Sequence, residues 1–431
     1  MSLALVLTLS AVARAGKEPM NDKPTIELRT LWEGKPVASS WTPLGSEILS
    51  LPPTVPDPPP AGAFIANKTP ANNSRLAGSV PSGSWTPAWR VAGPHDRWAA
   101  ILTAGSRILI PESSAGGKAW TVLDGSGRPI AEGRRGMPFE IDESGHYFFS
   151  SDTRSMIRIY SLTDGTDIGP VFVSEVQSLT HATRRGARWI VVDRRYPPGE
   201  EEAEPHDTSI TAFELSWPPR NSSKNDSSLE GVSFQQTIQA ESTDVYAAIT
   251  SSHVWVAAPN ALYRLNLKLE AEAAWRGPID PRGLSTDGER VYVLSFDEAI
   301  TRIHLIAFNA RGRLLWKHTC DDWDFRAPPI VGYKNDAYLL TSKKLTHLGP
   351  DGSILWERVF SAEALGGAVS MDDKAVVTTL HDVLVFDPAG TPTVIASYPN
   401  ETIVGAPSMT ADGNLLIVTD KALYALHRPL P

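Results

Sequence analysis

The sequence predicts an all-β fold, a β-propeller of eight four-stranded blades, with seven blades as the alternative count. Three observations support this prediction. Short apolar strands recur at intervals of about 40 residues along most of the chain. A second apolar strand and then a tight turn follow most of them, and several of these turns lead into a strand that ends in tryptophan. A repeat of about 40 residues is the length of one propeller blade.

The first strand of each repeat is short, apolar and preceded by turn residues. A glycine stands just ahead of five of these strands, where a hairpin needs a positive φ. The eight strands span residues 107–110, 146–149, 188–191, 253–256, 290–293, 336–339, 374–377 and 414–417. Six of the seven intervals between them lie near 40 residues, so the repeat is regular.

Tryptophan recurs in phase with these strands. Trp275, Trp316 and Trp356 each end the last strand of a repeat, and their spacings are 41 and 40 residues. A second feature with the same period makes chance agreement improbable. We interpret each tryptophan as a large apolar plate that packs between neighbouring blades, which is a structural role.

The one long interval between repeats contains two polar, proline-flanked segments, 197–207 and 218–231. Both are predicted to be surface loops inserted into the third repeat, and loops of this kind often carry binding residues. Just before them lies the densest positive group of the chain, which includes Arg184, Arg185 and Arg188. These arginines could bind an acidic partner surface, or they could pair with the glutamates at 200–202.

The N-terminal residues 1–15 resemble a signal peptide. Leu3 to Val12 form a short apolar run, and Ala13-Arg14-Ala15 is the small-x-small pattern that precedes cleavage. The positive region that normally comes first is missing, so the true start could lie upstream, and a simple apolar terminus is the alternative. The run is too short for a transmembrane helix. We therefore expect a periplasmic or secreted protein without a transmembrane segment.

The next two segments differ in character. Residues 16–34 include an alternating stretch that ends in Leu31-Trp32, and the last repeat lacks an outer strand. We therefore predict that this N-terminal strand completes the last blade through Trp32 and closes the ring, a dangling strand being the alternative. Residues 35–95 are rich in proline, serine and glycine and are predicted to be a flexible linker. The propeller then spans 96–431.

Charge and motifs restrict the function. The net charge of −9 and the pI near 5.6 give no support for nucleic-acid binding. The single cysteine, Cys320, excludes an intramolecular disulfide and a cysteine-rich metal site. No nucleophile elbow, His-Glu-x-x-His pair or glycine-rich phosphate loop is present. We therefore assign no catalytic residue, no metal ligand and no cofactor.

Two outer-strand motifs carry a family resemblance. FNARGRLLW (308–316) and GPDGSILW (349–356), and more weakly LNLKLEAEAAW (265–275), resemble the blade signature of the quinoprotein-like (PQQ-type) propeller superfamily. In repeat type and blade number the chain is similar to the propeller lipoproteins of the outer-membrane β-barrel assembly machinery. It differs from them because it lacks the lipidation cysteine and carries the proline-rich segment. This resemblance implies an exported scaffold.

The predicted function is therefore an exported, non-catalytic, monomeric scaffold that binds another protein. Two alternatives stay open. The first is a quinone- or metal-dependent enzyme that uses the central funnel, although the quinone enzymes of the superfamily hold their cofactor with a vicinal cysteine pair that this chain lacks. The second is a carbohydrate-binding propeller, in which Trp98, Trp120 or Trp217 would stack on sugar rings.

Overall fold

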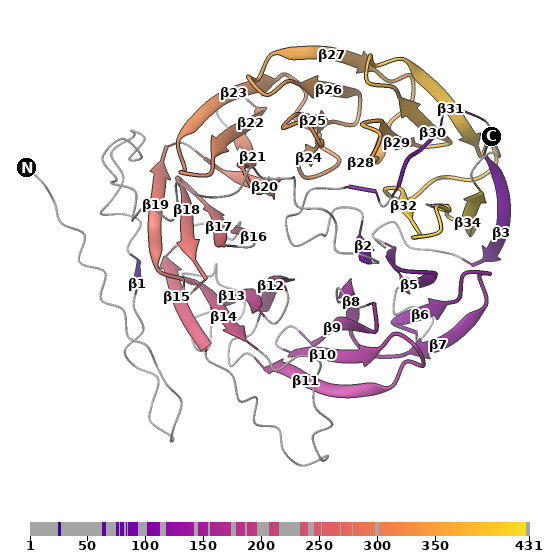
Figure 1. Cartoon of the computed structure of the whole chain (residues 1–431), viewed down its shortest axis with the longest axis horizontal. Coiled ribbons are helices and arrows are strands. Elements are labelled where there is room, and N and C mark those ends of the chain that lie inside the picture. The colour runs from indigo at the N-terminus through magenta and orange to yellow at the C-terminus, as the bar shows by residue number, and fades with distance from the viewer. Residues whose placement is uncertain are drawn as a thin grey trace, which may run out of the picture.

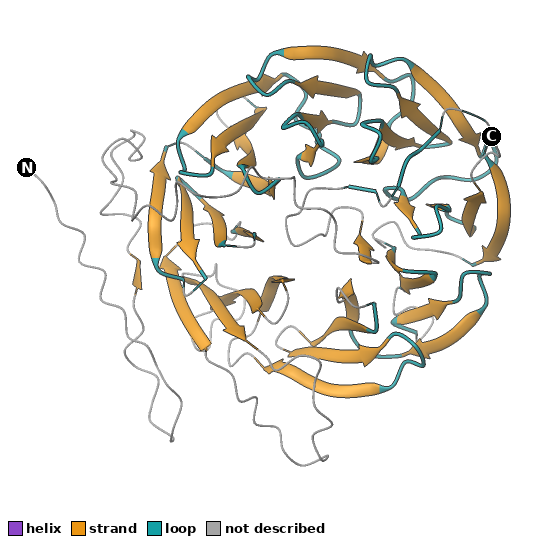
Figure 2. Ribbon diagram, in the orientation of Figure 1, coloured by secondary structure: helices purple, strands orange, loops and turns teal. Residues whose placement is uncertain are grey.

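The computed structural model describes residues 25–26, 63–65, 75–76, 78–81, 83, 85–93, 101–112, 118–141, 145–153, 156–173, 178–185, 188–195, 207–214, 233–239, 245–250, 252–267, 269–277, 279–297 and 301–427. All regular elements within these ranges are β-strands (Figure 2). The strands form eight sheets that follow one another around a ring (Figure 1). Within the described ranges, no helix is long and apolar enough to cross a membrane.

The sheets are numbered here in chain order of their inner strands. Sheet 1 contains β2 (Ala63–Ile65), β4 (Leu102–Ala104), β5 (Arg107–Pro111), β6 (Trp120–Leu123) and β7 (Pro129–Gly133). Sheet 2 contains β8 (Met137–Ile141), β9 (Tyr147–Thr153), β10 (Met156–Ser161) and β11 (Asp167–Val173). Sheet 3 contains β12 (Ser178–Arg185), β13 (Arg188–Arg195), β14 (Asp207–Glu214), β15 (Ser233–Gln239) and β1 (Thr25–Ile26). Sheet 4 contains β16 (Tyr246–Ile249), β17 (His253–Ala258), β18 (Ala261–Asn266) and β19 (Ala271–Arg276).

The remaining four sheets have the same pattern. Sheet 5 contains β20 (Pro281–Thr286), β21 (Arg290–Asp297), β22 (Arg302–Asn309) and β23 (Leu314–Cys320). Sheet 6 contains β24 (Ile330–Val331), β25 (Ala337–Leu340), β26 (Lys344–Leu348) and β27 (Ile354–Val359). Sheet 7 contains β28 (Ala364–Val369), β29 (Ala375–Thr379), β30 (Asp382–Phe386) and β31 (Pro392–Ser397). Sheet 8 contains β32 (Ser408–Met409), β33 (Leu415–Val418), β34 (Ala422–His427) and β3 (Thr86–Ala92).

The predicted repeat matches this architecture. Each of the eight apolar segments picked from the sequence overlaps the second strand of a different sheet, counted from the centre and, in sheet 1, without the added inner strand β2. Glycines ahead of these strands, such as Gly105 and Gly413, have positive φ in the turn that joins the first two strands. Because the repeat of about 40 residues equals one sheet, the all-β propeller class is confirmed.

The core lies between the sheets. Six of the seven apolar clusters in the described residues join two neighbouring sheets. In β21, for example, Val291 and Val293 face sheet 4, whereas Tyr292 and Leu294 face sheet 6. Successive side chains of a strand point to opposite faces, so a sheet covered on both faces needs an unbroken apolar strand. The continuous apolar runs in the sequence follow from this packing.

The strand that closes the ring is not the predicted one. β3 pairs antiparallel with β34 and is the outer strand of sheet 8. Thr25 and Ile26, from the segment predicted to close the ring, pair instead with Thr237 and Ile238 of sheet 3. An N-terminal segment does complete the last sheet, but it comes from residues that were assigned to the linker. The predicted closing residue Trp32 lies outside the described residues.

The predicted linker, 35–95, also contains ordered structure. Besides β2 and β3, it contributes a strap, defined here as the described residues between Arg75 and Trp85. The buried side chains of Leu76, Val80 and Trp85 join the apolar cluster between sheets 7 and 8. The proline- and serine-rich composition concealed these few apolar residues, which are widely spaced and follow neither strand nor helix periodicity.

The ring has two distinct faces. One face, called here the connection face, carries the links between successive sheets and the turns between the second and third strands. Backbone hydrogen bonds join these parts, for example from the Ser342 amide to the Asp324 carbonyl and from the Asp420 amide to the Thr402 carbonyl. The opposite face carries the other turns, including the one where the Met371 amide bonds to the Gly78 carbonyl.

Candidate functional site

Three tryptophans join neighbouring sheets in the same way. Trp316 and Trp356 lie over Gly352 and Gly390, which occupy turns of the next sheet, and a Cβ added to either glycine would lie 2.6 Å from the indole ring. Each indole Nε1 donates to the carbonyl two residues before its glycine, at 3.1 Å in both cases. Both glycines have positive φ, so the turn and the indole together require glycine there.

The third tryptophan of this kind is Trp89 on β3. Its ring lies 2.7 Å from the position of a Cβ on Gly127, and its Nε1 donates to the Gly125 carbonyl at 2.8 Å. The sequence prediction missed Trp89 because it fell in the assigned linker. A usable signal exists, since Trp89, Trp316 and Trp356 each precede their turn glycine by 34 to 38 residues.

Trp275 packs between sheets 4 and 5, as predicted, but from another position of its outer strand than Trp316 and Trp356. In each outer strand that carries a docking tryptophan, one extra residue, a β-bulge, directly precedes the tryptophan. Trp316, for example, follows such a bulge and lies opposite Ala307. In sheet 4 the residue after the bulge is Ala273, opposite Arg264, and Trp275 lies two residues further on, opposite Leu262. Trp275 therefore covers its own neighbour Gly277 and contacts Phe308 of sheet 5 edge-on, with ring centroids 5.2 Å apart.

Between sheets 4 and 5, an arginine donates to the turn carbonyl that accepts from a tryptophan in the other docking pairs. Arg264 Nη1 donates to the carbonyl of Ala310 at 2.6 Å, two residues before the turn glycine Gly312. The buried guanidinium also lies 3.3 Å from Glu272, the bulge residue, which is 3.0 Å from His253. Burial, with the charge of Arg264, lowers the pKa of His253 to about 4, so this histidine is neutral near pH 7.

The arginines predicted to bind a partner lie on a single hairpin. Arg184 and Arg185 belong to β12, Arg188 begins β13, and Arg185 is directly opposite Arg188 in the register. The structure therefore brings the three backbones together at one end of sheet 3. Their side chains and most of both inserted segments lie outside the described residues.

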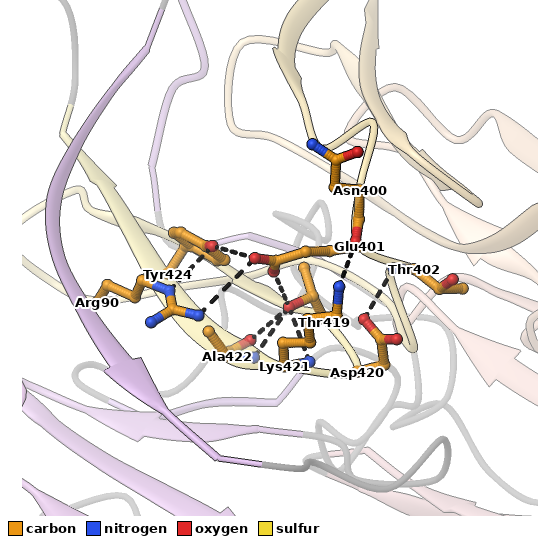
Figure 3. Close-up of polar contacts among 9 residues, drawn as sticks. All are labelled: Arg90, Asn400, Glu401, Thr402, Thr419, Asp420, Lys421, Ala422 and Tyr424. Atoms are coloured by element: carbon orange, nitrogen blue, oxygen red, sulfur yellow. Dashed lines mark hydrogen bonds and ion pairs between the residues drawn. The ribbon is translucent and has the colours of Figure 1, made fainter.

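A polar cluster on the connection face fastens β3 to the ring (Figure 3). Glu401 accepts hydrogen bonds from the hydroxyls of Tyr424 (2.8 Å) and Thr419 (2.6 Å). Arg90 on β3 donates to the Tyr424 hydroxyl at 3.0 Å and lies 3.8 Å from Glu401. Nearby, Lys421 donates to the carbonyl of Asn400. The cluster therefore links the closing strand, β34 and the connection between sheets 7 and 8.

The strap reinforces the same seam from the centre of the ring. The buried Arg75 donates from Nε to the Val331 carbonyl at 3.1 Å, and its guanidinium lies 4.4 Å above the ring of Tyr333. The Leu76 amide donates to the Val369 carbonyl at 2.7 Å. The strap thus runs from the inner strands of sheets 6 and 7 to Trp85, and β3 follows at the rim (Figure 1).

One further ionisable pair is buried inside sheet 6. His347 Nε2 lies 2.6 Å from Asp336, and the His347 ring stacks on Tyr338 with centroids 4.1 Å apart. Burial raises the pKa of Asp336, but the hydrogen bond and charge of His347 and backbone amides outweigh it, so the net shift is downward. Both side chains are 6% exposed, which suits a structural pair rather than a reactive one.

Three features of the described residues bear on the predicted alternatives. Within these ranges, no group of three or more His, Cys, Asp or Glu is arranged to hold a metal ion. Cys320 is buried in the core, and burial raises the pKa of its thiol. Trp120, one of the tryptophans considered for sugar stacking, is 1% exposed and lies against Gly133, so it is unavailable to a sugar. Trp98 and Trp217 lie outside the described residues.

Four-stranded sheets arranged around a ring define a β-propeller. Among solved structures, the chain resembles the computationally designed Ika8 protein, with a TM-score of 0.50 and 10% identity over 81% of this chain and 98% of that one. It also resembles BamB from Moraxella catarrhalis (TM-score 0.47, 14% identity, 81% of this chain and 100% of BamB). A third similarity is to the C-terminal WD40 domain of Sif2 (TM-score 0.46, 12% identity, 81% and 100%). These similarities concern the fold. No family model and no curated protein matches the chain.

Proposed function

We propose that this chain is an exported, non-catalytic scaffold that binds another protein through the surface of its ring. One observation carries the proposal. The described residues include nine exposed large apolar side chains, and seven of them lie on outer strands. These seven are Ile130, Ile168, Leu315, Ile354, Leu355, Val359 and Val394. Three of the seven share one strand, β27, and exposed apolar side chains that lie together are typical of protein-binding surfaces.

The outer strand β27 is the most apolar of these surfaces. Ile354, Leu355 and Val359 are 50%, 54% and 77% exposed. The charged side chains of the same strand are paired. Glu357 accepts from Thr346 and pairs with Lys344, and Arg358 donates to the Gly390 carbonyl. The exposed apolar side chains of this strand therefore lie beside paired charges, and water contacts them at a free-energy cost that a partner would remove.

The inserted segments 197–207 and 218–231, with Arg184, Arg185 and Arg188, remain the second proposed contact region. Polar loops on a rigid ring can contact a partner without disturbing the core. Removing either segment is therefore expected to leave thermal stability nearly intact while weakening partner recovery. Equal partner recovery after both deletions would contradict this placement.

Site-specific photo-cross-linking tests the proposal. A photoreactive amino acid at Leu355 of the full chain, expressed in the cell that produces it, is expected to give a discrete adduct with another protein. The matched control places the same amino acid at Val377, which is fully buried, and is expected to give none. Cell fractionation of the same samples tests export. Failure to obtain any adduct from Leu355 and from the inserted segments would overturn the scaffold function.

A further inference from the structure

Trp323 is an exposed tryptophan on a rigid loop of the connection face. It lies between β23 and β24, and 58% of it is exposed. The residues beside it are fixed. The Asp324 carbonyl accepts from the Ser342 amide at 2.7 Å, and the Arg326 amide donates to the Leu340 carbonyl at 3.0 Å. A bridge between Phe325 and Thr341 adds a third attachment.

The fold gives no reason for this tryptophan to be there. Trp316 and Trp356 fill seams between sheets, whereas Trp323 is absent from every apolar cluster of the described residues. An indole held on an immobile backbone loses little conformational freedom when it is buried by a partner. Tryptophan is also the residue type most enriched among binding hot spots.

Carboxylates are in excess around Trp323. Asp321, Asp322, Asp324 and Glu363 supply four negative charges. Arg326 pairs with both Asp324 (2.6 Å) and Glu363, and Arg302 pairs with Asp321 at 3.2 Å. The side chain of Asp321 is 85% exposed, so its pair with Arg302 is weak and can exchange for a partner's cation. With the exposed Lys343 included, the surface keeps a net negative charge.

We propose that Trp323 and Asp321 form a docking surface for an extended, arginine-containing segment of a partner protein. This inference rests on the proposed scaffold function and names a specific surface for it. A guanidinium from the partner stacks on the indole face and approaches the Asp321 carboxylate, and a neighbouring apolar side chain covers the remaining indole edge. The overall net charge of −9 favours the approach of such a segment over long distances.

Fluorescence anisotropy with synthetic peptides tests the proposal on the full chain. The probe is a fluorescein-labelled octapeptide of alternating arginine and valine, compared with glutamate–valine and serine–valine versions. The arginine peptide is expected to bind more tightly than both. Trp323→Ala should weaken its affinity by at least about tenfold. Asp321→Asn should weaken it less and flatten its salt dependence.

Met371 provides the matched control, because it is 57% exposed but lies on the opposite face. Met371→Ala should leave the affinity unchanged. The proposal is overturned if Trp323→Ala binds the arginine peptide like the original chain, or if that peptide binds no more tightly than about 1 mM. A negative result here alongside an adduct from Leu355 would reject this surface while leaving the scaffold function intact.

Discussion

Trp89 lies over Gly127 with the same geometry that joins Trp316 to Gly352. In both pairs the indole Nε1 donates to the carbonyl two residues before the glycine. Both pairs join an outer strand to the sheet that follows it in the chain, and the first starts from β3, the strand that pairs with β34 and closes the ring within sheet 8. The strand that closes the ring is therefore attached to the next sheet by the same contact as the outer strand of an ordinary sheet.

The docking tryptophans should contribute strongly to stability. Trp356 is 8% exposed and contacts both Tyr338 and Phe386. Trp356→Ala is expected to lower the free energy of unfolding by about 3–5 kcal/mol, because it leaves a cavity between sheets 6 and 7. The exposed Trp323→Ala should change it by about 0.5 kcal/mol or less. Denaturant unfolding measures both variants, and equal losses would contradict the structural role of Trp356.

Gly127 should tolerate no side chain, for two separable reasons. It has a φ of +81°, and an added Cβ would lie 2.7 Å from the Trp89 ring. Gly413 has a φ of +85° but nothing within 4 Å of an added Cβ. Gly413→Ala is therefore expected to lose only about 1–2 kcal/mol from backbone strain. Gly127→Ala should lose more stability, because the Trp89 indole must also move. The difference in stability between the two variants, measured by thermal unfolding, is the cost of moving the indole.

The pair formed by Asp336 and His347 should make stability dependent on acid. The pKa of Asp336 is lower in the folded chain than in the unfolded one. The ionised Asp336 therefore contributes fully to the free energy of unfolding above the pKa of an unfolded aspartate, about 4. This contribution is lost as the pH falls through the lower pKa of the folded chain. At pH 7, Asp336→Asn should cost about 3–5 kcal/mol, because a buried pair is broken. In acid, the free energy of unfolding of this variant should depend less on pH than that of the original chain.

The control for this prediction is a similar but more open pair. Asp297 lies 3.4 Å from His304, and the Asp297 side chain is 38% exposed. Asp297→Asn is therefore expected to cost at most about 1 kcal/mol. A loss as large as that of Asp336→Asn would mean that burial does not determine the strength of these pairs.

The polar cluster around Glu401 should control the fraying of β3. Tyr424→Phe removes the hydrogen bonds to Glu401 and from Arg90, and is expected to cost about 0.5–1.5 kcal/mol. Amide hydrogen exchange should accelerate in β3 more than in β25, which lies in sheet 6. Equal acceleration of exchange in all sheets would argue against a local effect of the polar cluster on β3.

The sequence was sufficient for the repeat because inner strands such as β17, β21 and β29 are buried on both faces. Runs such as Val291 to Leu294 must then be apolar without interruption, and such runs are visible at a regular interval. The docking role of Trp316 and Trp356 was visible for the same reason, since each follows a glycine-containing turn. Both signals depend on contacts that recur once in every sheet.

The closing segment was missed although Trp89 precedes Gly127 by nearly the same spacing that separates the other docking pairs, because the composition around it is typical of a linker. Trp89 and Trp85 follow a proline- and serine-rich stretch, and nothing local distinguishes them from linker tryptophans. Trp275 packs between sheets 4 and 5 as predicted, but its spacing did not reveal that Ala273 occupies the position after the bulge, where the other docking tryptophans stand in their outer strands. A shift of two residues in the tryptophan position is smaller than the variation in repeat length, so the spacing could not reveal it. No sequence pattern relates Glu401 to its polar partners, which come together only in the folded chain.

The position of β3 also determines when the protein can finish folding. Arg90 and Tyr424 are 334 residues apart in the chain but share a hydrogen bond. At ordinary rates of synthesis the ribosome needs on the order of tens of seconds to make the residues between them. During that interval, β3 has no partner strand and the apolar seam of sheet 8 is incomplete. The ring therefore closes only after β34 has been made, and a chaperone that protects the waiting strand would increase the yield of folded protein.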